Sequence, residues 1–249
     1  MKEKIICVIP ARYSSERLPG KVLYKIDGKS VLQRVYERAL LCKRYFSEII
    51  IATDDERIRK ECENFGAKCL LTPLNCKSGS DRVAEIAKKI DCDIVVNLQA
   101  DEPFIPKEGI IKPIEEIIKN KNENVVTSLT KIRKKEELYD ENVVKTVIDK
   151  NKYALYFSRS LIPYPRIYFS NENLKWNRKV YFYKHIGIYV FKKDFLMKFA
   201  SWPVSFLEKI EKLEQLRIIE NGYRIKVVII KNDSPSVDTI EDIKKLKNQ

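Results

Sequence analysis

Short apolar runs alternate with amphipathic stretches of helical spacing through the first half of the chain. We expect strands at 5–11, 48–53, 68–71 and 93–99, and helices that follow Ser30 and span 56–65 and 81–90. Strands and helices that alternate at these lengths predict right-handed βαβ units and a mostly parallel sheet. Because such sheets bind ligands beyond the carboxyl ends of their strands, candidate functional residues should lie there.

The second half of the chain has a different pattern. We expect strands at 143–149, 153–159, 181–191 and 224–231, a polar, aromatic loop at 160–180, and helices near 194–200, over 206–221 and from Thr239. No internal repeat or linker divides the chain. The pattern therefore predicts one domain, 1–249, with an inserted subdomain at about 160–205.

The composition excludes several kinds of functional site. The 249 residues include one histidine, His185, and seven glycines. A three-histidine zinc site and an HExxH protease are excluded, and neither a GxGxxG nor a GxxxxGK[ST] loop occurs. No apolar stretch approaches the ~18 residues of a membrane span, and the first residues show no signal-peptide pattern. The six cysteines form no CxxC pair, which favours reduced thiols in a cytoplasmic protein.

The formal net charge of +13 is unevenly distributed. Residues 1–50 hold 11 basic and 5 acidic side chains, and residues 151–200 hold 10 basic and 2 acidic ones. A nucleic-acid-binding tail more often shows one dense Lys/Arg block, which is missing here. The distribution favours a pocket that receives anions from two directions, and a solvated basic surface is the alternative.

Three cations follow the first predicted strand. Arg12, Arg17 and Lys21 stand five and four residues apart in a loop braced by prolines and Gly20. Charges this close repel one another unless an anion joins them. The loop therefore predicts a site for a triphosphate, held by fixed cations rather than by a glycine-rich turn. The alternative is a solvated basic loop.

Polar residues appear at the carboxyl end of the predicted strand that precedes Asp101. By two-residue alternation, Asn97, Gln99 and Asp101 share one side. Asp101-Glu102-Pro103 offers carboxylate oxygens to Mg²⁺, which takes one or two carboxylates together with substrate phosphates. The alternative is an Asp that caps a helix after Pro106, which begins too far along the chain for Asp101. Near the C-terminus, Thr239 begins a capping box, so Asp238 is left without the obvious structural task. Asp238 is a candidate second metal ligand, and a purely structural role is equally open.

Polar side chains also interrupt apolar surroundings in the second half. Alternation places His185, Gly187 and Tyr189 on one face, where the glycine leaves room for a ligand or another backbone. A packed core histidine is an equal alternative for His185. Glu214 interrupts the apolar face of the longer helix, which is costly unless a cation, a metal or a substrate hydroxyl pairs with it, an internal salt bridge being the alternative. Arg159 ends its strand where an anion can dock.

Taken together, the motifs resemble the 3-deoxy-D-manno-octulosonate (Kdo) cytidylyltransferases, also called CMP-Kdo synthetases. The segments are IPARYSSERLPGK (9–21), ATDD (52–55), SGSDR (78–82), NLQADEP (97–103), YALYFSRSLIP (153–163), KHIGIY (184–189), LEKIEKLEQLR (207–217) and VDTIED (237–242). The resemblance runs from Ile5 to the last helix. It departs mildly at Ser80-Asp81, where many members carry Thr-Glu, and the loop 164–180 matches no motif.

The resemblance implies an α/β fold with a Rossmann-like mixed, mostly parallel sheet of the nucleotide-diphospho-sugar transferase type. It also implies a small inserted subdomain at about 160–205 for sugar binding and dimerisation. The implied reaction moves CMP from CTP to the anomeric hydroxyl of Kdo and releases pyrophosphate, for lipopolysaccharide biosynthesis. The implied partners are CTP, Kdo and a second copy of the chain, with no nucleic acid and no membrane span.

The resemblance also implies a role for each matched residue. The triphosphate would be bound by Arg12, Arg17 and Lys21, the cytidine by Ser78 and Arg82, and Mg²⁺ by Asp101 and Asp238, with Lys21, Asp101 and Asp238 as the catalytic set. The pocket for the sugar acid would be lined by Gln99, Arg159, His185, Tyr189, Glu214 and Gln215. The rival readings are a CMP-sialate synthetase, another sugar nucleotidyltransferase and, from a different class, a basic nucleic-acid-binding protein.

Overall fold

The computed structural model describes residues 3–15, 18–76, 78–166 and 181–247. Its strands are β1 (Ile5–Pro10), β2 (Lys25–Ile26), β3 (Lys29–Ser30), β4 (Glu48–Thr53), β5 (Cys69–Leu71), β6 (Ile94–Leu98), β7 (Val125–Lys131), β8 (Lys145–Ile148), β9 (Ala154–Ser158), β10 (Tyr183–Lys192) and β11 (Lys226–Ile230). Its α-helices are α1 (Val31–Leu40), α2 (Glu56–Asn64), α3 (Gly79–Lys89), α4 (Lys107–Lys119), α5 (Glu136–Tyr139), α6 (Lys193–Ser201), α7 (Phe206–Glu211), α8 (Leu216–Glu220) and α9 (Ile240–Lys247).

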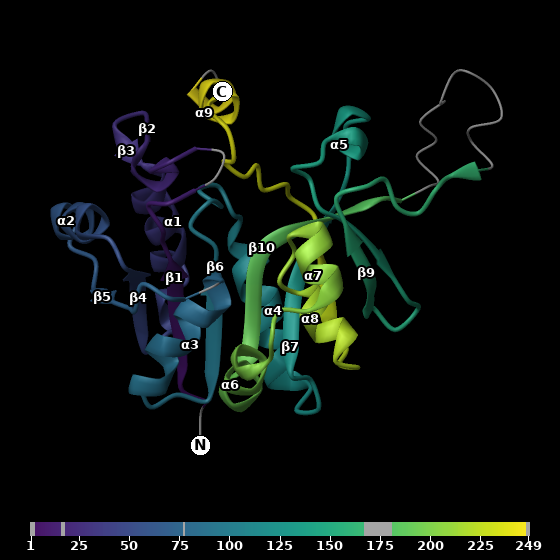
Figure 1. Ribbon diagram of the computed structural model, residues 1–249, viewed down its shortest axis with the longest axis horizontal. Coiled ribbons are helices and arrows are strands. Elements are labelled where there is room, and N and C mark those ends of the chain that lie inside the picture. The colour runs from purple at the N-terminus through teal and green to yellow at the C-terminus, as the bar shows by residue number, and fades with distance from the viewer. Residues whose placement is uncertain (1–2, 16–17, 77, 167–180, 248–249) are drawn as a thin grey trace.

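The main sheet follows the order β11-β7-β10-β6-β1-β4-β5 (Figure 1). β1 pairs in parallel with β4 and β6, and β11 pairs in parallel with β7. β10 is antiparallel to both β6 and β7, and the β8–β9 hairpin extends from it. The predicted mixed, mostly parallel sheet is confirmed. The single domain and the subdomain at about 160–205 stay predictions, and residues 167–180 lie outside the described part of the chain.

Helices cover both faces of the sheet, which explains why its central strands are apolar on both sides. Alternate residues of β1 enter two different clusters, Cys7 and Ile9 on one face and Ile6 and Val8 on the other. The first cluster is completed by α1, α2 and α4, and the second by α3, α6 and α8. Burial of every β1 side chain follows from this arrangement.

Local signals account for several boundaries. Ser30 caps α1 by accepting a hydrogen bond from the backbone N–H of Gln33. Gly66, at a φ of +72°, follows α2 in the left-handed conformation that glycine adopts readily. Thr239 and Asp242 exchange the two hydrogen bonds of a capping box before α9, as predicted.

The prediction of one helix over 206–221 is wrong. The chain forms two short helices, α7 and α8, because Lys212 adopts a left-handed conformation at a φ of +54°. Glu214 therefore lies in the turn between two helices and does not interrupt one helical face. The break moves its carboxylate toward the start of α3, as described below.

The structure also contains α4 and β7, of which only the start of α4 after Pro106 was expected. Pro113 lies inside α4 and cannot donate a hydrogen bond to the carbonyl of Gly109, four residues earlier. The hydroxyl of Ser128 on β7 donates to that carbonyl at 2.8 Å. The strand thus satisfies an acceptor that the proline leaves without its helical partner.

Candidate active site

A cavity of about 500 Å³ opens beyond the carboxyl end of β6. Eight of the residues proposed from the sequence line it, namely Gln99, Asp101, Arg159, His185, Tyr189, Glu214, Gln215 and Asp238. They lie on β10, just after β6 and β9, in the turn between α7 and α8, and in the segment that precedes α9. Side chains far apart in the sequence therefore meet at the edge of the sheet where a ligand was expected.

Two carboxylates converge on one ammonium group beside this cavity. The Nζ atom of Lys21 lies 2.7 Å from Oδ2 of Asp101 and 3.0 Å from Oδ1 of Asp238. The backbone N–H of Val237 donates to the carbonyl of Asp101 at 2.9 Å, which ties the two acidic segments together. Burial opposes the charged form of Lys21, but the two carboxylates outweigh it and raise its pKa.

Glu102, the neighbour of Asp101, is a buried carboxylate to which no role of its own was assigned from the sequence. Its Oε1 accepts from the backbone N–H of Gly187 at 2.7 Å, and its Oε2 accepts from the hydroxyl of Ser234. Burial and the charge of Asp101 raise the pKa of Glu102 to about 8. Glu102 thereby joins β10 to the segment that carries Asp238.

Two side chains of the protein approach the backbone at Gly187. A Cβ atom there would lie 3.0 Å from Cβ of Gln99 and 3.0 Å from Oε1 of Glu102. A side chain at this position would crowd Gln99 and Glu102, and Gly187 also lines the cavity, so room for a ligand there stays a prediction.

His185 is packed among aromatic rings and also lines the cavity, so the two alternatives for it are not exclusive. Its ring lies 5.0 Å from that of Tyr189 and meets Phe157 edge-on at 5.5 Å. Its Nε2 atom lies 2.8 Å from Oγ1 of Thr127. Burial lowers the pKa of His185 to about 3, so the ring is neutral near pH 7.

A chain of hydrogen bonds joins Glu214 to Gln99. The Ser80 hydroxyl donates to Oε1 of Glu214 at 2.6 Å and accepts from Nδ2 of Asn97 at 3.0 Å. Oδ1 of Asn97 accepts from Nε2 of Gln99 at 3.0 Å. Burial raises the pKa of Glu214, and its bonds to Ser80 oppose that rise. Both the hydroxyl and the backbone N–H of Ser80 donate to Glu214.

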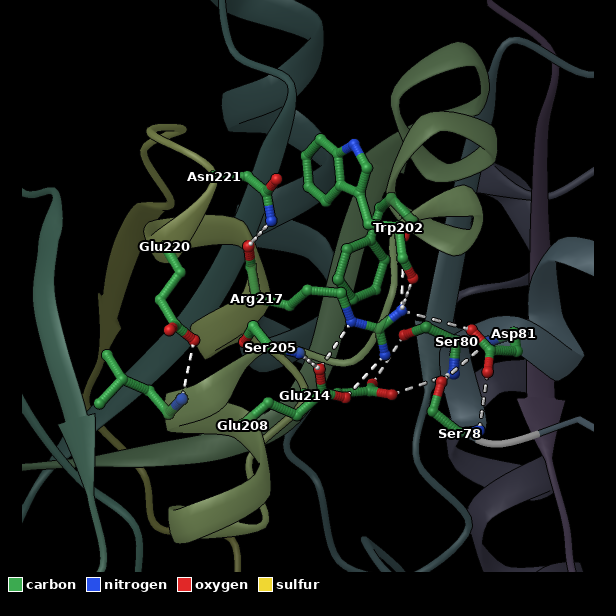
Figure 2. A network of polar contacts seen from close by, with 12 residues as sticks. Ser78, Ser80, Asp81, Trp202, Ser205, Glu208, Glu214, Arg217, Glu220 and Asn221 are labelled. Carbon is green, nitrogen blue, oxygen red and sulfur yellow. Dashed lines mark hydrogen bonds and ion pairs between the residues drawn. The ribbon is translucent and has the colours of Figure 1, made fainter.

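Arg217 holds the turn that carries Glu214, and the sequence did not reveal it (Figure 2). Its buried guanidinium donates two hydrogen bonds of 2.7 Å to the carboxylate of Glu208. It also lies 3.8 Å from Oδ1 of Asp81 at the start of α3. Arg217 therefore packs the α7–α8 turn against the helix that presents Ser80.

Arg159 presents its guanidinium at the cavity through neutral partners. Nε donates to the carbonyl of Glu211 and Nη1 to the carbonyl of Glu141, both at 2.8 Å. Within the described residues no carboxylate forms an ion pair with this guanidinium. The geometry therefore fixes a positive charge at the cavity wall without neutralising it, as an anionic ligand requires.

The remaining proposed residues do not line this cavity. Ser78 caps α3 in a capping box with Asp81. Arg82 is fully buried and donates to Oδ2 of Asp54 at 2.6 Å. Nη2 of Arg12 is buried and has no hydrogen-bond partner in the part of the chain that the structure describes. Arg17 lies outside the described residues, and the proposed nucleotide contacts of all four stay predictions.

Comparison with known proteins defines the class. Residues 6–229 match the family model described as cytidylyltransferase. The chain belongs to this family. A structure of 4-diphosphocytidyl-2C-methyl-D-erythritol synthase from Anaerococcus prevotii has the same fold, with a TM-score of 0.62 at 16% identity over 100% of this chain and 98% of that one.

More similar relatives define the branch of the family. The chain is 47% identical over 98% of its length to 3-deoxy-manno-octulosonate cytidylyltransferase of Chloroherpeton thalassium, covering 96% of that protein. It is 46% identical over 96% of its length to the protein of the same name in Thermodesulfovibrio yellowstonii, covering 94% of it. A solved CMP:2-keto-3-deoxy-manno-octonic acid synthetase, complexed with CTP, is 38% identical with a TM-score of 0.86, over 98% of this chain and 97% of that one. The resemblance seen in the sequence is confirmed.

Proposed function

We propose that this protein activates Kdo by transferring CMP from CTP to its anomeric hydroxyl, with release of pyrophosphate. One observation carries the proposal: Lys21, Asp101 and Asp238 converge beside a cavity that also presents Arg159 and Glu214. Family membership and the relatives named above support the same reaction. Lipopolysaccharide biosynthesis is the expected use of the product.

Different cations of the site would bind the two anionic substrates. Arg12 and Lys21 supply cations for the triphosphate, and the unpartnered Nη2 of Arg12 has the chemistry to bind a phosphate oxygen. Arg159 supplies the cation for the sugar carboxylate. The attack of a hydroxyl on the α-phosphate needs positioning and charge neutralisation more than a protein nucleophile. The neutral His185 is not assigned as a general base.

Asp101 and Asp238 fit a Mg²⁺ site because both carboxylates already converge on one cation, the ammonium group of Lys21. The described residues contain no group of three or more His, Cys, Asp or Glu side chains that could hold a metal, so substrate oxygens would complete the coordination. When bound, Mg²⁺ would lower the pKa of the attacking hydroxyl and stabilise the charge of the departing pyrophosphate. Two carboxylates and a nearby triphosphate suit that chemistry.

Assembly and location are part of the same proposal. We expect a homodimer in which the segment 160–205 forms the contact, and the exposed rings of Tyr164 and Tyr181 within it support this expectation. A cytoplasmic location is expected for an enzyme that uses CTP, and the six cysteines are free thiols. No helix of the described residues is long and apolar enough to cross a membrane.

A substrate panel with a pyrophosphate assay tests the proposal. Purified protein with Mg²⁺ should release pyrophosphate from CTP and Kdo, and much less from CTP with N-acetylneuraminate or from UTP with a sugar 1-phosphate. Turnover of N-acetylneuraminate in preference to Kdo would assign the chain to sialate activation. Salt-dependent, sub-micromolar binding to duplex DNA without pyrophosphate release would support the nucleic-acid-binding alternative.

A further inference from the structure

The buried hydroxyl of Thr127 on β7 lies between the ring of His185 and the carbonyl of Ile188, both on β10. Oγ1 of Thr127 lies 2.6 Å from the carbonyl oxygen of Ile188 and 2.8 Å from Nε2 of His185. Thr127 has no exposed surface. The pairing of β10 with β7 shifts register between Ile186 and Tyr189, so both groups lie beside the irregular part of the strand.

The chemistry of the three groups fixes the direction of both hydrogen bonds. A carbonyl oxygen only accepts, so the single hydroxyl proton of Thr127 is donated to Ile188. The same oxygen must then accept from His185, which places the proton of the imidazole on Nε2. A neutral imidazole carries one N–H, and Nδ1 is therefore left as an acceptor. The low pKa of His185 keeps the ring in this neutral form near pH 7.

Gln99 is oriented in a similar way on the same cavity. An ionised Glu214 only accepts, so Ser80 donates to it, Asn97 donates its amide to Ser80, and Gln99 donates its amide to Asn97. The carbonyl oxygen Oε1 of Gln99 remains as an acceptor. Two cavity-lining side chains are thus held with acceptors available, which suits a ligand rich in hydroxyl donors.

We propose that Thr127 is a positioning residue that locks His185 in its Nε2–H tautomer, so that Nδ1 accepts a hydrogen bond from a hydroxyl of the sugar substrate. The identity of the sugar rests on the proposed function, whereas the tautomer does not. Thr127 acts only through His185 and touches no reacting atom.

The chain offers a direct reading of the tautomer because His185 is its only histidine. A long-range ¹H–¹⁵N spectrum of the labelled protein should show a protonated Nε2 and an unprotonated Nδ1 in the wild type. Thr127→Val removes the hydroxyl at nearly constant volume, and its ¹⁵N shifts should move toward a mixture of tautomers. Thr127→Ser keeps a hydroxyl and should retain the wild-type pattern. A protonated Nδ1 in the wild type, or unchanged shifts in Thr127→Val, would overturn the assignment.

Kinetics provide the second reading. Thr127→Val should raise the KM for Kdo roughly tenfold with the KM for CTP unchanged, as the loss of one oriented hydrogen bond predicts. Thr130→Val is the matched control, because Thr130 lies on the same strand and its buried hydroxyl bonds only at 3.4 Å to the carbonyl of Ile230. Equal effects of both substitutions, or equal effects on both substrates, would contradict the proposal. A wild type that shows the predicted tautomer but no turnover of Kdo would instead refute the proposed function alone.

Discussion

The hydroxyl of Ser80 donates to the carboxylate of Glu214 at 2.6 Å, although 134 positions separate the two residues in the sequence. The bond joins the start of α3, beside the predicted cytidine-binding residues, to a turn that lines the cavity proposed for the sugar. A buried carboxylate that loses such a donor becomes harder to ionise. The ionisation of Glu214 on the cavity wall therefore depends on a residue of α3.

Removing this donor should weaken sugar binding selectively. We expect Ser80→Ala to raise the KM for Kdo about tenfold and to leave the KM for CTP within about twofold, because one hydrogen bond to a charged group is lost. Ser80→Thr keeps the hydroxyl and should restore the wild-type KM. Steady-state kinetics with each substrate varied in turn gives the comparison, and a matching rise for CTP would show that Ser80 acts on the fold of α3 instead.

Substitution of Asp101 should separate activity from stability. Asp101→Asn should reduce turnover by at least about a hundredfold, because the carboxylate that pairs with the Lys21 ammonium and is proposed to hold Mg²⁺ loses its charge. The melting temperature should change by only a few degrees, since the carboxylate is partly exposed. Asp91→Asn, which alters an exposed surface ion pair, is the control. A large loss of stability in Asp101→Asn would identify a structural carboxylate.

Arg159 should distinguish between the two substrates. Arg159→Ala removes the cation at the cavity wall and should raise the KM for Kdo by about ten- to a hundredfold, with a small effect on CTP. Arg159→Lys keeps the charge but loses the planar guanidinium, so its KM for Kdo should lie between those of the wild type and Arg159→Ala. Kinetic constants for both substrates in the three proteins measure the order, and a CTP-specific defect would place Arg159 on the nucleotide.

The buried His185 predicts a dependence of stability on pH. Its pKa of about 3 in the folded chain lies below the ordinary value, so between pH 6.5 and 3 the unfolded chain binds a proton that the folded chain does not. Its contribution to the free energy of unfolding is therefore complete above pH 6.5 and is lost as the pH falls toward 3. Urea unfolding of wild type and His185→Gln from pH 7 to 4 should show the steeper decline in the wild type, by up to about 1.4 kcal/mol per pH unit. Parallel curves would contradict the burial of a neutral ring.

The buried pair of Arg217 and Glu208 should behave as a unit. Arg217→Met leaves the Glu208 carboxylate without its partner and should lower the free energy of unfolding by about 3–5 kcal/mol. The double variant Arg217→Met with Glu208→Leu removes both charges and should recover much of that loss. Urea denaturation of the single and double variants measures the coupling, and additive losses would show that the pair contributes independently.

Elements with strong local signals were predicted well from the sequence. β4 spans the residues predicted for it, Ser30 begins α1 through its side-chain cap, and Gly66 follows α2 through its left-handed backbone. The helix expected over 206–221 failed because apolar residues keep helical spacing across Lys212, whose left-handed conformation has no local signal. β7 was not predicted because Thr127, Ser128 and Thr130 interrupt its apolar pattern, and their hydroxyls find partners only in the folded protein.

Some residues of the candidate site were also predicted from the sequence and others were not. Asp101, Arg159 and Glu214 were selected because a charge at a strand end or among apolar neighbours needs an explanation. The structural roles of Glu102 and Arg217 were missed because each interacts with groups that are distant in the sequence or hidden within an ordinary charged helix. A charge in an unexpected position can be recognised in the sequence, whereas a contact between distant residues cannot.

The central claim is that the chain joins CMP to Kdo, and ³¹P NMR of the reaction mixture tests it most directly. With CTP, Kdo and Mg²⁺, the account predicts one new phosphodiester resonance and pyrophosphate in equal amounts, both abolished in Asp101→Asn. Pyrophosphate without a sugar phosphodiester, or no consumption of CTP in the presence of Kdo, would contradict it.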